Sequence, residues 1–163
     1  MEQRKNKTRI DKVNNYLNMA ETAAERGTCI RNNYGAIIVK NDEIISSGYT
    51  GAPRGRKNCC DIGECRRRKH NTPSGAGFEL CRSVHAEMNA IISAARRDMI
   101  DATLYLVGVN KRNGEYKENT QPCTLCKRLI INAGIKTVVI RISKTEYRTI
   151  EVSTWIENDD TFD

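Results

Sequence analysis

Two short runs of the sequence hold residue types that could bind a metal ion. Cys123 and Cys126 follow Pro122 at the expected start of a helix, so both sulfurs should lie on one helical face. A helix N-terminus stabilises the thiolate, which is the form that zinc binds. His85, one of only two histidines, lies at the start of another expected helix. These three ligands would leave the fourth tetrahedral position of a zinc ion open to water, which is typical of a catalytic site.

Glu87 lies two residues after His85, where its carboxylate could face that water as a base. Zinc lowers the pKa of bound water toward neutrality, and a carboxylate can take a proton and later return it. An acid in the first turn of a helix is also favoured by the helix dipole alone. The catalytic interpretation of Glu87 therefore depends on the neighbouring ligands.

The elements that must position these residues follow from hydrophobic periodicity and turn residues. Strands 102–109 and 136–142 are joined by a helix, so we expect them to be parallel with a right-handed crossover. The fold class predicted is a three-layer α/β/α domain with a mixed central sheet. The pattern predicts helix 10–26, an antiparallel hairpin of 34–40 and 43–50, helix 84–97, strand 102–109, helix 123–134, strand 136–142 and a short helix around 153–159.

Length and composition favour one cytoplasmic domain. The 163 residues fit a single core, which we place at about 10–142, with a Cys- and Arg-rich loop insertion at about 51–82 and a tail at 143–163. No apolar run could span a membrane, and the N-terminal segment lacks the apolar stretch of a signal peptide. In a reducing compartment the seven cysteines are expected to bind metal or do chemistry rather than form disulfides.

The net charge of +7 is concentrated in one region. Eight basic residues lie between Pro53 and Arg82 against three acidic ones, whereas the last seven residues are acidic. Such a patch could attract a phosphorylated metabolite or a nucleic-acid backbone, or could simply be a solvated loop.

The combination of both metal-binding runs resembles the deoxycytidylate deaminase family of the cytidine deaminase-like zinc deaminases. The resemblance covers residues 10–142 and includes "RGTCIRNNYGAIIVKNDEIISSGYTGAPRG", "CRSVHAEMNAI" and "QPCTLCKRLIINAGI". It implies hydrolysis of deoxycytidine monophosphate (dCMP) to dUMP and ammonia, for dTMP supply. His85, Cys123 and Cys126 would hold the zinc, and Glu87 would shuttle protons while C4 of cytosine is attacked.

The resemblance also implies a second, structural zinc in some relatives. Cys29 and Cys59 fall at the matching positions, and Cys65, His70 or Cys81 could complete the ligand set. Reduced thiols without a metal are the competing interpretation, because no Cys-x-x-Cys pair is present in this region.

The run "GYTGAPRG" resembles the family's nucleotide-contacting turn. Thr50 and Gly51 are candidates for substrate binding, although Thr50 stands where relatives commonly have an Asn that bonds the sugar. Arg31, Arg54 and Arg56 are candidates for the phosphate, which a guanidinium can grip through two hydrogen bonds. A surface arginine without a ligand is the alternative for each.

Three other functions fit parts of the sequence. A deaminase of tRNA adenosine or single-stranded DNA cytosine fits the basic patch, but aromatics make up only 6% of the chain and stacking residues are scarce. A non-catalytic zinc module serving competence or DNA uptake would not need Glu87. A riboflavin-pathway deaminase is less favoured, because no reductase domain follows. The resemblance further implies a homo-oligomer, often a hexamer, and leaves open regulation by dCTP and dTTP.

Overall fold

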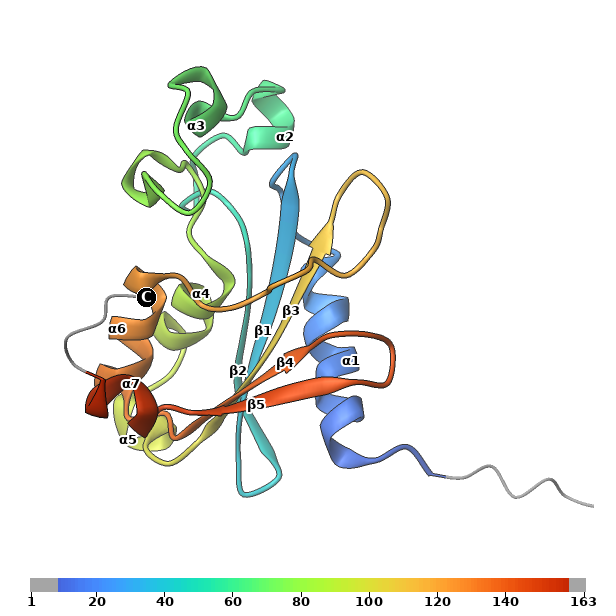
Figure 1. Cartoon of the computed structure of the whole chain (residues 1–163), viewed down its shortest axis with the longest axis vertical. Coiled ribbons are helices and arrows are strands. Elements are labelled where there is room, and N and C mark those ends of the chain that lie inside the picture. The colour runs from blue at the N-terminus through green and yellow to red at the C-terminus, as the bar shows by residue number, and fades with distance from the viewer. Residues whose placement is uncertain (1–8, 159–163) are drawn as a thin grey trace, which may run out of the picture.

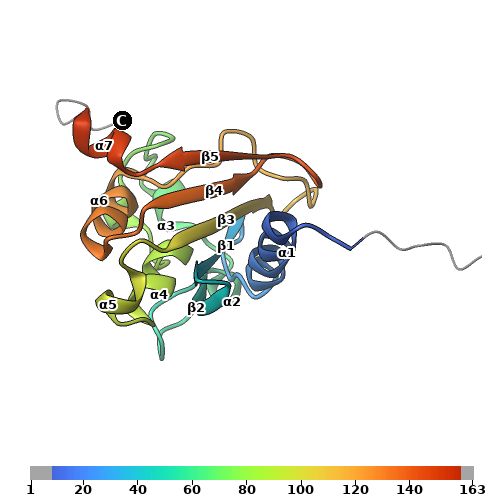
Figure 2. The same cartoon turned by 90° about the horizontal axis from the view of Figure 1, so that it is seen from below.

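The computed structural model describes residues 9–158, in which one five-stranded sheet lies between helices (Figures 1 and 2). The N-terminal residues 1–8 and the C-terminal residues 159–163, which include three of the acidic residues of the tail, lie outside this range. The elements are α1 (Lys12–Ala24), β1 (Asn32–Lys40), β2 (Glu43–Tyr49), α2 (Cys59–Ile62), α3 (Arg66–Lys69), η1 (Phe78–Leu80), α4 (Ala86–Ile92), α5 (Arg96–Met99), β3 (Thr103–Asn110), α6 (Thr124–Ala133), β4 (Thr137–Arg141), β5 (Tyr147–Glu151) and α7 (Ser153–Glu157).

The strand order is β2-β1-β3-β4-β5. The predicted hairpin is confirmed, because β1 pairs with β2 in antiparallel fashion around the Asn41-Asp42 turn. The pair β3 and β4 is parallel, as the intervening helix α6 predicted, and β1 pairs with β3 antiparallel. The sheet is therefore mixed.

The two faces of the sheet bury alternate side chains. On one face Leu17 of α1 belongs to a buried cluster with Ile37 and Val107. On the other face, Ile38 and Leu106 belong to the cluster that contains residues of α4 and α6. Figure 2 shows α1 on one side of the sheet and α4, α5 and α6 on the other. The predicted three-layer arrangement is confirmed.

Two glycines let helices approach the sheet closely. A Cβ atom on Gly35 would collide with the backbone of α1, and one on Gly48 would collide with the carbonyl oxygen of Ala86 and the nitrogen of Ala90 in α4. The second contact fixes the height of α4 over β2, and the predicted metal ligand His85 lies at the start of that helix.

The structure corrects two predicted elements. Helix 84–97 is interrupted: α4 ends at Ile92, and Ala95 adopts extended backbone before α5 begins. The hydroxyl of Ser93 donates to the carbonyl of Asn89 at 2.8 Å, a side-chain bond that competes with the helical pattern.

The tail contains a strand, β5, that the sequence pattern did not predict. Its side chains are mostly exposed, so it lacks the alternation of a half-buried strand. It forms because its backbone pairs antiparallel with β4, from Thr137 opposite Glu151 to Arg141 opposite Tyr147. The short helix expected after it is present as α7, and Asp159 of that prediction lies outside the described residues.

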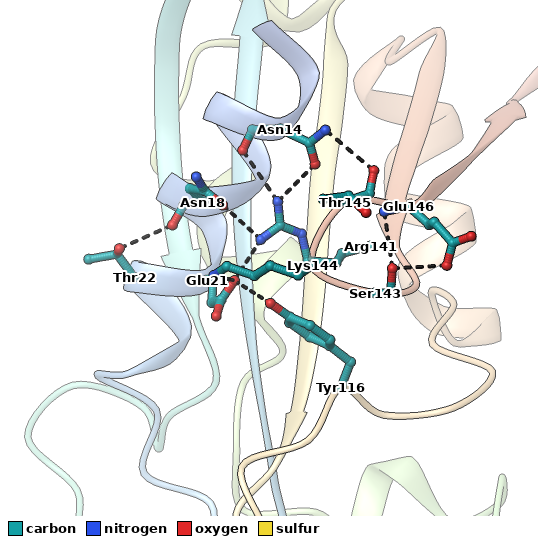
Figure 3. Close-up of polar contacts among 10 residues, drawn as sticks. All are labelled: Asn14, Asn18, Glu21, Thr22, Tyr116, Arg141, Ser143, Lys144, Thr145 and Glu146. Atoms are coloured by element: carbon teal, nitrogen blue, oxygen red, sulfur yellow. Dashed lines mark hydrogen bonds and ion pairs between the residues drawn. The ribbon is translucent and has the colours of Figure 1, made fainter. Parts of the chain in front are cut away.

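A buried arginine attaches α1 to the end of β4 (Figure 3). The side chain of Arg141 is fully buried, and its Nη1 lies 2.6 Å from Oε2 of Glu21. Nη1 also donates to Asn18 at 2.8 Å, and Nη2 donates to Asn14 at 3.2 Å. The hydroxyl of Tyr116 donates to Glu21 at 2.9 Å, which ties the segment after β3 to the same cluster.

Candidate metal centre

Three predicted ligands meet where α4 and α6 begin. His85 is the N-cap of α4, Cys123 is the N-cap of α6, and Cys126 lies buried in the first turn of α6. Nδ1 of His85 lies 3.4 Å from each of the two sulfurs. Within residues 9–158, this is the only group of three or more potential ligands whose atoms all lie within 4.8 Å of one another. Two thiols and one imidazole fit zinc, which favours sulfur and nitrogen ligands in tetrahedral geometry.

His85 is positioned by the turn that follows β2. Gly51 and Val84 pair as a short antiparallel bridge, with N···O distances of 2.7 and 3.2 Å. One helical turn further on, the side chain of Asn89 donates to the carbonyl of Tyr49 at 2.8 Å. Bonds on both sides of His85 thus fasten the start of α4 to the end of β2.

Cys123 is positioned by the segment between β3 and α6. The hydroxyl of Thr120 donates to the carbonyl of Lys117 at 2.7 Å, and Arg148 of β5 donates to the carbonyl of Thr120 at 2.6 Å. The N–H of Cys126 donates to the sulfur of Cys123 at 3.5 Å, which is the side-chain cap of α6. The strand that the sequence did not predict therefore supports the approach to the metal ligands.

The protonation of the three predicted ligands determines how many protons must leave when a metal ion binds. The hydrogen bond from Cys126 and that from His85 outweigh burial and lower the pKa of Cys123 to about 4. Burial favours neutral imidazole, but hydrogen bonds to Cys123 and Cys81 raise the pKa of His85 to about 10. The bond to Cys123, together with burial, raises the pKa of Cys126. Metal binding to such a set releases its protons, so affinity for zinc should rise with pH.

Glu87 lies in the first turn of α4 and is only 4% exposed. Burial raises the pKa of this carboxyl, whereas the charge of His85 opposes the shift. A buried carboxyl whose pKa is raised holds a proton more readily than an exposed one, which suits a group that transfers protons.

Tyr34 is a residue of the site that sequence reasoning missed. Burial is the main cause that raises the pKa of the Tyr34 phenol. The charges of Glu87 and Cys123 raise it further, which indicates that the phenol lies near both groups. The ring lies over Gly108 of β3, where a Cβ atom would meet it at 2.6 Å. A tyrosine within a strand is an ordinary strand former, and its neighbour Gly108 is brought to it only by the pairing of β1 with β3, so no local pattern indicated its place in the site.

The cysteines predicted for a second zinc lie in one neighbourhood. Burial raises the pKa of Cys59, and the thiols of Cys29, Cys81 and Cys65 are near enough to raise it further. No three of these sulfurs lie as close together as the group around His85, among the described residues. His70 is exposed on the insertion.

The residues predicted to bind substrate fall into two groups. The hydroxyl of Thr50 is buried and accepts the backbone N–H of Tyr34 at 3.1 Å, while Gly51 pairs with Val84 beside His85. Arg31 is partly buried, and Arg54 and Arg56 are exposed. The turn thus lies next to the metal centre, with the side chain of Thr50 directed to backbone.

A basic hollow lies on the insertion, apart from the three metal ligands. Its volume is about 290 Å³, and Glu64 in its wall pairs with Lys69 at 3.1 Å. The lining residues are Ile62, Glu64, Arg66, Lys69, His70 and Arg82.

Comparison with known proteins matches residues 10–142 to the family described as the cytidine and deoxycytidylate deaminase zinc-binding region. The chain belongs to this family. The predicted resemblance is confirmed, and the matched range contains both predicted metal-binding runs and the insertion between them.

Individual relatives of the deaminase family agree with this assignment. The deoxycytidylate deaminase of Mycobacterium phage D29 is 36% identical over 76% of this chain and 89% of its own length. That of Schizosaccharomyces pombe is 33% identical over 78% of this chain, which spans only 36% of the yeast protein. The dCMP deaminase of cyanophage S-TIM5, solved in complex with dCMP and dUMP, superposes with a TM-score of 0.54 at 27% identity, covering 78% of each chain.

Proposed function

We propose that the protein is a zinc-dependent deaminase that hydrolyses dCMP to dUMP and ammonia. The observation that carries this function is the buried Glu87 beside the group of His85, Cys123 and Cys126. A purely structural metal site would not need a buried carboxylate. The relatives named deoxycytidylate deaminase support dCMP as the substrate.

The roles of the residues follow from their chemistry. His85, Cys123 and Cys126 would hold the zinc, which, when bound, polarises water so that hydroxide is available at neutral pH. Glu87 would take a proton from the attacking water and deliver it to N3 of cytosine as the C4–O bond forms. The proton of the new C4 hydroxyl would then pass through Glu87 to the amino group, so that the C4–N bond breaks, the C4 carbonyl forms and ammonia leaves. The raised pKa of the buried carboxyl fits a group that must both hold and release a proton.

A screen of substrates for ammonia release tests this proposal. We expect release from dCMP and much slower release from deoxycytidine, because Arg31, Arg54 and Arg56 are proposed to bind the phosphate. Equal rates on both would indicate a nucleoside deaminase. Activity on tRNA or single-stranded DNA with none on dCMP would overturn the proposal.

We also propose a second, structural zinc held by Cys29, Cys59, Cys65 and Cys81. The proximity of the Cys29, Cys65 and Cys81 thiols to Cys59 supports it, because four cysteine sulfurs are a common ligand set of structural zinc sites. Purified protein should then contain two zinc ions per chain. Replacing Cys59 by Ser should remove one of them and replacing His85 by Ala the other, whereas one zinc in the unmodified protein would reject the second site.

The basic hollow is the proposed site for regulation by dCTP or dTTP, since its cationic side chains suit a triphosphate. Replacing Arg66 by Met should abolish any effect of either nucleotide on turnover and leave turnover without them unchanged. Homo-oligomeric assembly and a cytoplasmic location also stay predictions, the first of which sedimentation can test.

A further inference from the structure

The imidazole of His85 is in contact with an aromatic ring from the insertion. Phe78, in η1, packs against it with 5.6 Å between ring centroids and 81° between ring planes. This edge-to-face geometry is a favourable one for two aromatic rings. The contact matters because Nδ1 of the same imidazole faces the sulfurs of Cys123 and Cys126.

Phe78 is in turn held by Arg67 of α3. The guanidinium carbon lies 4.8 Å from the centre of the Phe78 ring, within the range of a cation–π contact. Nη2 of Arg67 also donates to the backbone carbonyls of Pro73 and Ala76, at 3.2 and 2.5 Å. The side chain of Arg67 therefore closes the loop that presents Phe78.

Arg67 is an unusual member of the basic run in α3. Its Nε atom is buried and has no hydrogen-bond partner among the described residues. The neighbouring residues Arg66, Arg68 and Lys69 are exposed. An arginine side chain that is partly shielded from water and donates hydrogen bonds to backbone carbonyls stabilises the local structure and adds little to the basic surface.

We propose that Phe78 is a positioning residue that orients the imidazole of His85 for the metal ion, and that Arg67 acts through Phe78. The inference rests on the proposed function, because it takes His85 as a zinc ligand. Groups that fix the ring of a metal-binding histidine raise metal affinity by holding the ligand nitrogen in place. The insertion thereby contributes to the metal centre without supplying any of its three ligand atoms.

Zinc affinity measured by competition with a chromophoric chelator tests this proposal. Phe78→Leu keeps apolar bulk but removes the ring, and we expect it to bind zinc about 10–100-fold more weakly. Arg67→Met should weaken binding by a smaller factor. Arg68→Met is the matched control on the same helix and should bind as the unmodified protein does. The His85→Ala variant lacks one ligand of this centre, so the zinc that it still binds belongs to other sites. That amount is subtracted from the zinc bound by each of the other variants.

The visible spectrum of the cobalt-substituted protein is an independent readout, because it reports the geometry of the two sulfurs and one nitrogen. We expect it to change in Phe78→Leu and to be restored, with zinc affinity, in Phe78→Tyr. Unchanged affinity and spectrum in Phe78→Leu would overturn the proposal, as would equal losses in Arg67→Met and Arg68→Met. If Phe78→Leu lowers the thermal midpoint of the zinc-free protein, its weaker zinc binding could come from poorer folding. Phe78→Tyr then decides, and its failure to restore zinc affinity would overturn the proposal. Tight zinc binding without turnover of dCMP would contradict the proposed function and leave this inference standing.

Discussion

Glu87 is an acid whose side chain is buried, and burial disfavours the charged form of a carboxyl group. Burial raises its pKa above the ordinary value near 4.5, so the folded protein holds the proton more tightly than the unfolded chain. The stability of the fold therefore falls as the pH rises above 4.5, and the full cost of the buried charge is reached above the folded-state pKa. A residue kept at such a cost is expected to serve chemistry rather than packing.

Glu87→Gln should separate catalysis from structure. The amide cannot shuttle a proton, so turnover of dCMP should fall by about 10²–10⁴-fold while zinc content stays the same. In zinc-free protein the variant should be at least as stable as the parent at pH 7, and this advantage should disappear as the pH falls toward 4.5. Ammonia release, zinc content and thermal midpoint should be measured together. Undiminished turnover would show that Glu87 is not the proton carrier.

Tyr34→Phe tests whether the phenol near Glu87 takes part in substrate binding. The change keeps the ring over Gly108 and removes only the hydroxyl, so folding and zinc content should not change. A hydroxyl that bonds the substrate should, when it is removed, lower kcat/KM for dCMP by about threefold to tenfold. Unaltered kinetics would assign Tyr34 a packing role alone.

At the scale of elements, the metal centre depends on how closely α4 lies on β2. Gly48→Ala would place a methyl group against the backbone of Ala86 and Ala90, so the helix must move. We expect a loss of roughly 1–3 kcal/mol in the free energy of unfolding and weaker zinc binding, because His85 caps the displaced helix. Urea unfolding and zinc competition measure the two effects.

Gly51→Ala is the matched control for stability. Its added methyl would meet its nearest neighbour, the hydroxyl of Thr28, at an ordinary 3.5 Å. The free energy of unfolding should therefore change by well under the amount seen for Gly48→Ala. Equal losses would mean that both effects come from glycine's backbone and not from the helix contact.

At the scale of the whole molecule, the sheet separates two kinds of polar site. The metal centre lies where α4 and α6 begin, whereas the buried pair of Arg141 and Glu21 joins α1 to β4 (Figure 3). The pair connects elements that are far apart in the sequence. Burial of the guanidinium makes its carboxylate partner indispensable, because an unpaired charge inside the protein is costly.

Glu21→Gln should destabilise the protein far more than removal of a surface pair. We expect a loss toward the lower end of about 3–5 kcal/mol, because the side chain of Glu21 is 26% exposed while that of Arg141 is fully buried. Lys12→Met breaks an exposed pair with Asp42 and should cost about 0–1 kcal/mol. Denaturant unfolding measures the free energy of unfolding of both variants. Similar decreases in the two would contradict the prediction that the buried pair stabilises the protein more than the exposed one.

Local information in the sequence determined the elements and the residue types of the metal centre. Spacing and capping predicted that Cys123 and Cys126 share a helical face and that His85 starts another helix, because these features depend on neighbours only a few residues away. The hairpin was predictable for the same reason, because its turn is local, and the parallel pair β3–β4 was predictable from the helix that joins the two strands. Packing across the chain decided the rest. The mostly exposed β5 exists through pairing with β4, the hydroxyl of Thr50 bonds the backbone of Tyr34, and the ring of Phe78 meets His85 only once the insertion has folded.

Arg141 shows most clearly what local sequence cannot predict. A charged residue is expected at the surface, and the burial of Arg141 becomes favourable only when α1 brings Glu21, Asn18 and Asn14 around it.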